Sequence, residues 1–239
     1  MTPDRINAGF DGLRGNVVFC SWTGDNPMSP QRSECLLSIY AQTGCPVMFL
    51  SAGSIPLWQR PDAPFHEGYA YLSATQKADY LRCYLMHHHG GGHTDIKRAQ
   101  RPWNGFFQQL RDSPALFGVG YTEIGPHGVA PVGGPLEDEM RANAHRLIGN
   151  CAYIFRRRTE FTDEWFGRTH RMLDAALPAL RENPARHPQD HRGVVLPDGT
   201  VSDYPLIWMA FCNIFHTVVW EMRDHIGHVD IAPDFRSYR

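Results

Sequence analysis

The sequence has no uninterrupted apolar segment as long as a membrane span, which takes about 20 residues. The longest apolar-leaning run covers residues 204–220 and is interrupted by Asn213 and His216. The N-terminus, Met-Thr-Pro-Asp-Arg, has no apolar region of the kind that a signal peptide carries. We therefore expect a cytoplasmic protein, with no transmembrane segment and with at most a peripheral association with membranes.

A strong excess of charge is also missing. The formal net charge is -2 over 239 residues, which argues against a polyanionic partner such as nucleic acid. The six cysteines form no C-x-x-C pair. Their even number allows a disulfide framework, but a chain of this length and 42% hydrophobic content can bury a core without one. We expect reduced thiols.

Internal repeats and low-complexity tracts are absent as well. The length suits one domain over residues 1–239. We expect its core at about residues 16–220, followed by a polar C-terminal tail.

The first part of the chain has a strand–helix–strand pattern. The β-branched and aromatic run 16–20 predicts a buried strand, Ser29-Pro30 predicts the start of a helix, and the run 46–50 predicts a second strand. Such a βαβ unit has parallel strands, and ligands of open α/β sheets bind beyond the carboxyl ends of the strands. Trp22 follows the first strand and is therefore a candidate binding residue.

The stretch from residue 73 to residue 97 is the most informative part of the sequence. Ser73 is a good helix N-cap, and Gln76 completes a capping-box pattern. Asp79 and Arg82 lie at i and i+3 of the predicted helix and so share a face. This helix therefore presents a carboxylate and a guanidinium group on one face.

Three glycines, at positions 90–92, follow this helix. Glycine adopts positive φ without steric cost, so the run predicts the end of the helix. Residues 93–97 then read as extended. Asp95 and Lys97 are two apart, and on a strand they would point to the same side.

The second half of the chain predicts further strands at 115–121 and 147–155 and a helix at about 163–180. Residues 124–140 are rich in glycine and proline and then acidic, which predicts a long loop or flap. Residues 183–202 predict a polar loop.

Two of these motifs together resemble a known group of enzymes. Ala-Asp-Tyr-Leu-Arg at 78–82, followed by Gly-Gly-Gly-His-Thr-Asp-Ile-Lys at 90–97, resembles the Ser-Asp-x-x-Arg…Gly-Gly-x-Tyr-x-Asp-x-Asp signature of sugar-nucleotide glycosyltransferases. The group includes glycosyltransferase family 32, capsular polysaccharide synthesis proteins and, more remotely, the large clostridial glucosylating toxins.

Two further segments extend the resemblance to roughly residues 16–220. Val-Val-Phe-Cys-Ser-Trp-Thr-Gly at 17–24 is similar to the family's Ile-His-x-x-Trp-x-Gly, and Tyr-Pro-Leu-Ile-Trp…Ile-Phe-His at 204–216 resembles a block of the capsular-type members. The spacing between the Asp-x-x-Arg helix and the Gly-Gly-x-x-x-Asp turn is the specific part.

The resemblance implies a GT-A-like fold, which is a Rossmann-type open mixed α/β sheet flanked by helices. It implies transfer of a sugar from a nucleotide-diphosphate donor to a hydroxyl of a glycan or other acceptor, in surface or capsular polysaccharide synthesis. It implies that Asp95 and Lys97 take the catalytic positions, and that Asp95 and His216 bind Mn²⁺ or Mg²⁺. The implied donor-binding residues are Trp22, Thr23, Asp79, Arg82, Gly91, Gly92 and Asn150.

Lys97 departs from the family pattern, because it stands where the signature has its second acid. Two unit charges about 4 Å apart repel by about 4 kcal/mol at an effective dielectric constant of 20, so a divalent ion beside an ammonium would cost about twice that. Lys97 could point at the diphosphate and partly replace the metal, or swing away while Asp95, His216 and phosphate oxygens hold the ion. Alternatively, catalysis has been lost. We favour the first two interpretations.

Simpler interpretations stay open for the same residues. Asp79 and Arg82 could form a surface ion pair, and Asp95 could cap the next turn. Trp22 and His216 could be core residues. The alternative function is a non-catalytic nucleotide-sugar or glycan-binding protein, in which Lys97 marks the loss of the second acid.

The remaining histidines and charge runs carry weaker signals. Residues 87–89 are three histidines at a helix end, where the dipole favours imidazolium; they diverge on a helix, which disfavours zinc. His187 and His191 form a weak metal-like pattern in a polar segment, and a metal-dependent hydrolase using histidines is a third possible function. Residues 137–139 and 156–158 are typical of solvated charge, although the flap that carries Glu137 could meet the acceptor.

Overall fold

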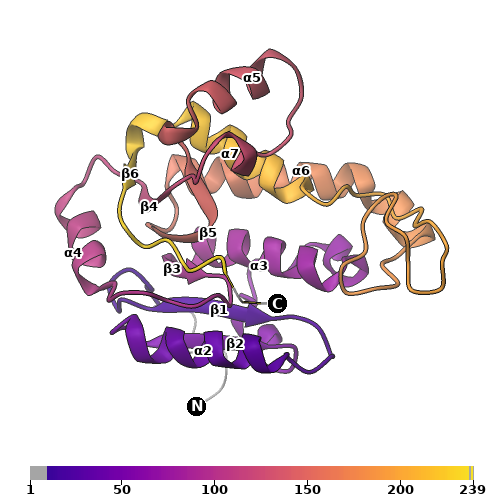
Figure 1. Ribbon diagram of the computed structural model, residues 1–239, viewed down its shortest axis with the longest axis horizontal. Coiled ribbons are helices and arrows are strands. Elements are labelled where there is room, and N and C mark those ends of the chain that lie inside the picture. The colour runs from indigo at the N-terminus through magenta and orange to yellow at the C-terminus, as the bar shows by residue number, and fades with distance from the viewer. Residues whose placement is uncertain (1–9, 237, 239) are drawn as a thin grey trace.

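A mixed β-sheet with helices on both faces organises the computed structural model, which describes residues 10–236 and 238. The described residues form a single-domain open α/β fold with one six-stranded sheet, in the order β2-β1-β3-β5-β4-β6 (Figure 1). In chain order the strands and helices are β1 (Val18–Trp22), α2 (Pro30–Gln42), β2 (Val47–Ser51), α3 (Ala74–His88), β3 (Gly91–Thr94), α4 (Asn104–Asp112), β4 (Gly118–Thr122), α5 (Gly134–Ala142), β5 (Ile148–Phe155), α6 (Glu160–Glu182), α7 (Ala210–Glu221) and β6 (Ile226–His228).

The predicted βαβ unit is confirmed. β1 pairs in parallel with β2 through α2, and it also pairs in parallel with β3 on its other side. From β1 the chain passes through α2 to β2 on one side of β1, and then through α3 to β3 on the other side. This reversal places a topological switch point between β1 and β3, where open α/β sheets bind ligands. The remaining pairs are antiparallel for β3 with β5 and for β5 with β4, and parallel for β4 with β6.

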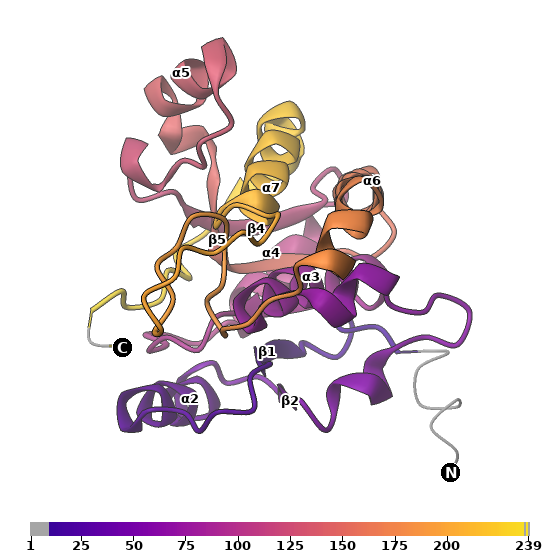
Figure 2. The ribbon, with the colours of Figure 1, turned by 90° about the vertical axis from the view of Figure 1, so that its right-hand side faces the viewer.

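The helices form a layer on each face of the sheet. Side chains of β5 alternate between two clusters: Tyr153 and Phe155 pack with α3, α6 and α7, whereas Ala152 and Ile154 pack with α4. α2 covers the end of the sheet near β1 and β2, on the same side as α4 (Figures 1 and 2). Both faces of the central strands are thus buried, so the open surfaces for binding are at the strand ends.

The predicted start of α3 is confirmed, but its capping box is not. The backbone N–H of Gln76 donates to Ser73 Oγ at 3.4 Å, as expected for an N-cap. The side chain of Gln76 does not return the bond. Instead its amide donates to the carbonyl of Ile207 at 3.0 Å and accepts from the Tyr204 hydroxyl at 2.7 Å. The side chain of Gln76, which a capping box would use locally, therefore makes long-range hydrogen bonds instead. These bonds connect α3 to the segment before α7.

Two other expectations are corrected, and one helix is additional. Residues 134–142 form helix α5 rather than a continuous flap: Glu137 accepts from the Gly133 N–H and pairs with Arg141 one turn later, which stabilises a short helix. The tail after residue 220 is not simply polar, because β6 forms the sheet edge beside β4. α4 is an additional helix that the sequence patterns did not predict.

The loop expected at 183–202 is confirmed, with an isolated bridge between Val195 and Val201. Figure 2 shows this segment reaching down from α6 past α3 toward β1. All six cysteines are unpaired, in agreement with the expectation of reduced thiols. Among the described residues, none of the helices combines the length and the apolar character needed to cross a membrane.

Candidate functional site

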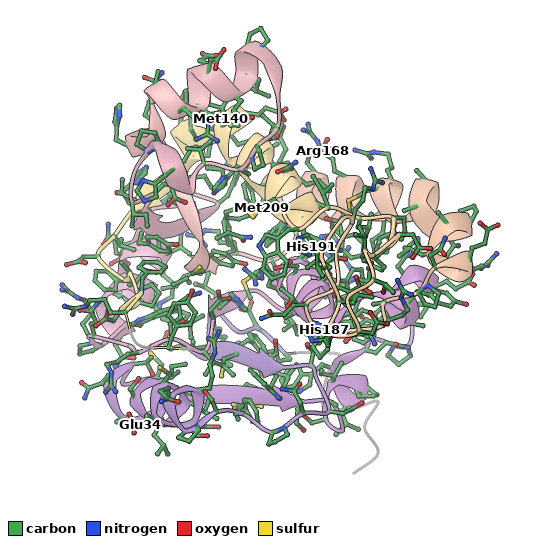
Figure 3. The ribbon with its side chains drawn as sticks, turned by 45° about the vertical axis from the view of Figure 1, so that its right-hand side comes forward. Glu34, Met140, Arg168, His187, His191 and Met209 are labelled. Carbon is green, nitrogen blue, oxygen red and sulfur yellow. The ribbon has the colours of Figure 1, made fainter. Side chains whose placement is uncertain are left out.

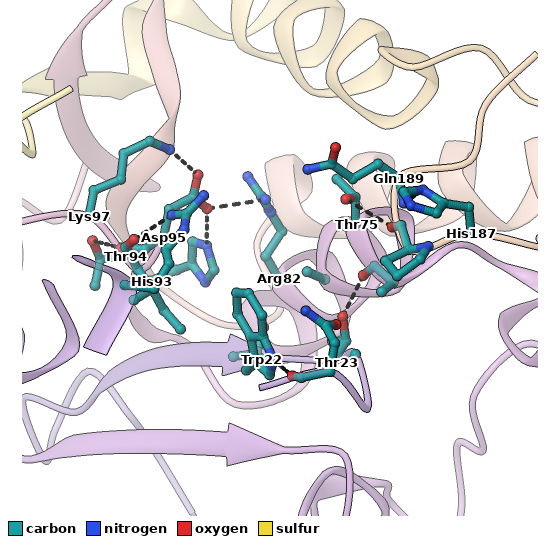
Figure 4. A pocket seen from close by; sticks show the side chains of 18 residues that line it. Trp22, Thr23, Thr75, Arg82, His93, Thr94, Asp95, Lys97, His187 and Gln189 are labelled. Carbon is teal, nitrogen blue, oxygen red and sulfur yellow. Dashed lines mark hydrogen bonds and ion pairs between the residues drawn. The ribbon is translucent and has the colours of Figure 1, made fainter. Parts of the chain in front are cut away.

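A pocket of about 330 Å³ opens at the carboxyl ends of β1 and β3, at the switch point of the sheet (Figure 4). Trp22 and Thr23 reach it from the end of β1, and Arg82 reaches it from α3. Asp95 and Lys97 reach it from the turn after β3. The structure thus brings five of the predicted site residues into one pocket, although they come from three separate parts of the chain.

Asp95 lies between two cationic side chains. Its Oδ2 is 2.6 Å from Lys97 Nζ, and its Oδ1 is 3.2 Å from Arg82 Nη2 (Figure 4). His93 Nε2 is 3.4 Å from the same Oδ1. Both carboxylate oxygens are therefore engaged. β3 ends at Thr94, so the pairing of Asp95 with Lys97 arises in a turn rather than on a strand as expected.

The charges of this cluster stabilise one another. Burial alone would raise the pKa of Asp95, but Lys97 and Arg82 outweigh it and hold that pKa well below its usual range. Burial would likewise lower the pKa of Lys97, yet the Asp95 carboxylate raises it above the ordinary lysine value. Asp95 is thus ionised and Lys97 is protonated at neutral pH.

Asp79 supports Arg82 from outside the pocket lining. Its Oδ1 is 2.8 Å from Arg82 Nη2, which confirms the predicted contact at i and i+3. Burial raises the pKa of Asp79 to about 6, an effect that the neighbouring Arg82 only partly offsets. The pair is partly buried rather than a solvated surface pair, so Asp79 positions the guanidinium that the pocket presents.

Trp22 and Thr23 shape the floor of the pocket. Trp22 is half-buried, and its indole N–H donates to the carbonyl of Asn26 at 2.7 Å. The Thr23 hydroxyl donates to the carbonyl of Ala74 in the first turn of α3. These bonds hold an aromatic ring beside the cationic cluster, so Trp22 is not simply a core residue.

Gly91 and Gly92 do not line the pocket. Gly91 has φ +98°, and a Cβ there would lie 2.8 Å from the carbonyl oxygen of Val17. A Cβ on Gly92 would lie 3.1 Å from the Trp103 ring. Their observed contribution is close packing of β3 against β1 and α4, and donor binding by these two glycines stays a prediction.

Asn150 contacts the cluster through its backbone. Its carbonyl oxygen accepts from Arg82 Nη1 at 2.5 Å, while its side-chain oxygen is buried without a partner among the described residues. It is not among the residues that line the pocket. Asn150 therefore positions Arg82 through its backbone, and a contact of its side chain with the donor stays a prediction.

His216 lies in a different environment from Asp95. Its Nδ1 accepts from the Ala130 N–H at 3.0 Å, and its Nε2 is 3.5 Å from Glu123 Oε2. His216 is 1% exposed and does not line the pocket. The structure does not bring it together with Asp95 as a pair of metal ligands.

The pocket residues do not fit a divalent ion. Asp95 is the one carboxylate among the lining residues, and both of its oxygens are engaged by Lys97, Arg82 and His93. A metal on Asp95 would contact an ammonium and a guanidinium, which repel it. In the part of the chain that the structure describes, no three histidine, cysteine or acidic residues are grouped as a metal site.

Two parts of the pocket wall were missed by the sequence patterns. Arg32, in the first turn of α2, lines the pocket and donates through Nη1 to the carbonyl of Ile96 at 2.5 Å. Residues 187–189 line the opposite wall, where the Thr75 N–H donates to the carbonyl of Pro188 at 3.0 Å. The sequence does contain a signal for Arg32, because this cation lies in the first turn of the helix that follows Trp22. The 187–189 wall depends on a contact between distant segments.

A second hollow of about 400 Å³ adjoins the pocket. The two share Trp22, Asn26, Arg32 and Gln189. Trp208, which is 39% exposed, lines the second hollow but not the first pocket. The pocket therefore has an adjoining aromatic space that is large enough for a second small molecule.

The histidine runs do not form metal sites among the described residues. The histidines at 87–89 are buried, and burial lowers the pKa of His87 and of His89 to about 4, so they are neutral rather than the expected imidazolium at a helix end. His187 and His191 lie on the loop between α6 and α7 (Figure 3) and bond to the backbone of Gln189.

Comparisons with known proteins provide no relative: no family model, no curated protein and no solved structure matches the chain. The function must therefore be inferred from the chemistry of the pocket.

Proposed function

We propose that this protein is a glycosyltransferase with a GT-A-like fold. It moves a sugar from a nucleotide-diphosphate donor to a hydroxyl of a glycan or another acceptor, and surface or capsular polysaccharide synthesis is its proposed setting. The observation that carries the proposal is a pocket at the β1–β3 switch point, lined by Trp22 and by the cations Arg32, Arg82 and Lys97.

The arrangement matches the parts of such a donor. Trp22 offers an aromatic face on which a base can stack. Lys97 and Arg82 offer fixed positive charge for a diphosphate, which binds guanidinium groups well because several N–H donors point the same way. The hollow beside Trp208 offers room for the acceptor next to the donor.

The proposed reaction needs stabilisation of its leaving group above all. The bond between the anomeric carbon and a diphosphate oxygen breaks, a bond between that carbon and the acceptor oxygen forms, and the hydroxyl proton is released. Negative charge develops on the leaving nucleoside diphosphate. Side chains that already hold positive charge at that position stabilise the transition state without reorganising.

A second candidate is a non-catalytic nucleotide-sugar-binding protein. It is favoured by one observation: both oxygens of Asp95, the carboxylate that lines the pocket, are engaged by neighbouring groups. A carboxylate in that state is poorly available as a base or nucleophile.

Calorimetry with a panel of nucleotide sugars, followed by assays for hydrolysis and transfer, separates the two candidates. Binding with turnover supports the transferase. Binding without turnover, with glycan acceptors present, supports the binding protein. If no nucleotide sugar binds, both proposals are wrong.

Trp22→Ala tests whether the nucleobase of the donor stacks on Trp22. Loss of one stacking partner should weaken nucleoside-diphosphate binding by about 1–3 kcal/mol, or about 5- to 150-fold in Kd. Trp22→Phe keeps an aromatic face and is the matched control. Equal affinity of the Trp22→Ala variant and the wild-type protein would remove Trp22 from the binding site.

A further inference from the structure

We infer that the pocket binds the diphosphate of its donor with the side-chain cations Lys97, Arg82 and Arg32, and that this binding needs no divalent metal. The inference rests on the proposed function and concerns the same pocket. It assigns to three side chains the role that a metal ion, held by the Asp-x-Asp of the glycosyltransferase signature, would otherwise have.

The first argument is the state of Asp95. An acid that anchors a metal must offer the ion at least one free oxygen. Here Lys97 lies 2.6 Å from one oxygen of Asp95, and Arg82 lies 3.2 Å from the other. Metal binding would first have to break two partly buried ion pairs.

The second argument is the balance of charge around the pocket. The lining residues include three permanent cations and one carboxylate, so 3 − 1 leaves a charge of +2, which equals that of a divalent ion. Asp79 pairs with Arg82 from behind the lining and reduces this charge, but the sum stays positive when it is ionised. The cations therefore provide for a diphosphate the attraction that an ion would otherwise provide.

The third argument is that each cation keeps hydrogen-bonding capacity. The Lys97 ammonium has three N–H donors, and its recorded hydrogen bonds go to Asp95 and to Cys151 Sγ. Arg82 is 8% exposed, and its Nε–H is buried without a partner among the described residues. Arg32 donates to the carbonyl of Ile96 and has no carboxylate within ion-pair distance in the described part of the chain.

Asp95 is then a positioning residue. It holds the Lys97 ammonium and the Arg82 guanidinium beside one another, where their mutual repulsion would otherwise drive them apart. Phosphate oxygens then meet two cations whose geometry is set before the ligand binds.

The direct test uses the wild-type protein. Binding of uridine diphosphate and guanosine diphosphate is measured by calorimetry in EDTA and in excess Mn²⁺. We expect Kd values that agree within about twofold. Binding that appears only with Mn²⁺, or that strengthens tenfold or more, overturns this inference and leaves the proposed function standing. If neither these nor other nucleoside diphosphates bind in either condition, the proposed function itself fails.

Variants of Lys97 sharpen the test. Lys97→Met should weaken nucleoside-diphosphate binding by about 10- to 100-fold, with or without Mn²⁺, because one charged donor is lost. Lys77→Met, on α3 outside the pocket lining, is the matched control and should bind as wild type. Unchanged affinity of a folded Lys97→Met variant overturns the role of Lys97.

Lys97→Asp restores the second acid of the signature. This variant should bind nucleoside diphosphates weakly in EDTA and regain affinity with Mn²⁺, because two adjacent carboxylates now form a site for the ion. Circular dichroism and thermal unfolding establish that each variant is folded. If a variant does not fold, the comparison of wild-type binding in EDTA and Mn²⁺ still decides the question.

Discussion

Arg82 is the residue around which the pocket is assembled. It contacts Asp79 on its own helix, Asp95 after β3 and the backbone of Asn150 on β5. Each contact involves a different element, so one side chain links α3 to the two central strands. Arg82 thus has a structural role besides its proposed binding role, and variants must be tested for both.

Asp95→Ala should destabilise the fold, because it leaves Lys97 and Arg82 side by side without a shared counter-ion. We expect a loss of about 2–3 kcal/mol in the free energy of unfolding, less than for a fully buried pair because the Asp95 side chain is 21% exposed. Urea unfolding measures this loss of stability. If the proposed function is right, the same variant should also lose donor turnover, which an assay with nucleotide sugars measures.

The matched control for this variant is Glu34→Ala. Glu34 pairs with Arg98 at the surface, where both side chains are more than half exposed, so the cost should be below about 1 kcal/mol. In the double variant of Asp95→Ala with Lys97→Met the two effects should not add. Additive losses would show that the ion pair contributes nothing to stability.

At the scale of elements, the glycines at the end of α3 and the start of β3 determine where Asp95, the carboxylate of the pocket, emerges. Gly90 takes φ +64° and ends α3, and Gly91 takes φ +98° at the start of β3. The helix can therefore turn directly into a strand that packs against β1. Asp95 emerges at the carboxyl end of that strand, beside the end of β1.

Gly91→Ala should destabilise the protein by at least about 2 kcal/mol. The positive φ costs an L-residue about 1–2 kcal/mol, and the new Cβ would lie 2.8 Å from the Val17 carbonyl oxygen. Gly53→Ala is the control, since no atom lies within 4 Å of its added Cβ. Thermal unfolding of the two variants measures the difference, and equal stability would contradict the packing role of Gly91.

At the scale of the whole molecule, neutral buried histidines couple stability to pH. Burial is the main cause that lowers the pKa of five histidines from 6.5 to about 4, namely His87, His89, His93, His170 and His216. Between pH 4 and 6.5 the unfolded chain binds more protons at these sites than the folded protein does. Stability therefore rises with pH across this window and levels off above it.

Urea unfolding at pH 4.5, 5.5, 6.5 and 7.5 tests this coupling. Each of these histidines contributes up to about 1.4 kcal/mol per pH unit. Asp79 acts in the opposite direction between its ordinary value of 3.8 and its raised pKa of about 6, and so does Glu123, whose pKa is raised by burial, but these are two groups against five. An unfolding midpoint that stays constant from pH 5 to 7 would show that the histidines are not buried as neutral groups.

Patterns along the chain predicted the features that depend on neighbouring residues. The βαβ unit, the Ser73 cap, the glycine end of α3 and the contact of Asp79 with Arg82 all follow from backbone preferences and helical spacing. These act over a few residues, so patterns along the chain reveal them.

The surroundings of Asp95 and of His216 depend instead on contacts between distant segments. The signature placed Asp95 with a metal and His216, whereas packing surrounds Asp95 with Lys97, Arg82 and His93, and encloses His216 near Glu123. Arg32 joins the same pocket from α2. Such neighbours are set by how helices and strands pack across the sheet, and the Coulomb energy of a group depends on them rather than on sequence spacing.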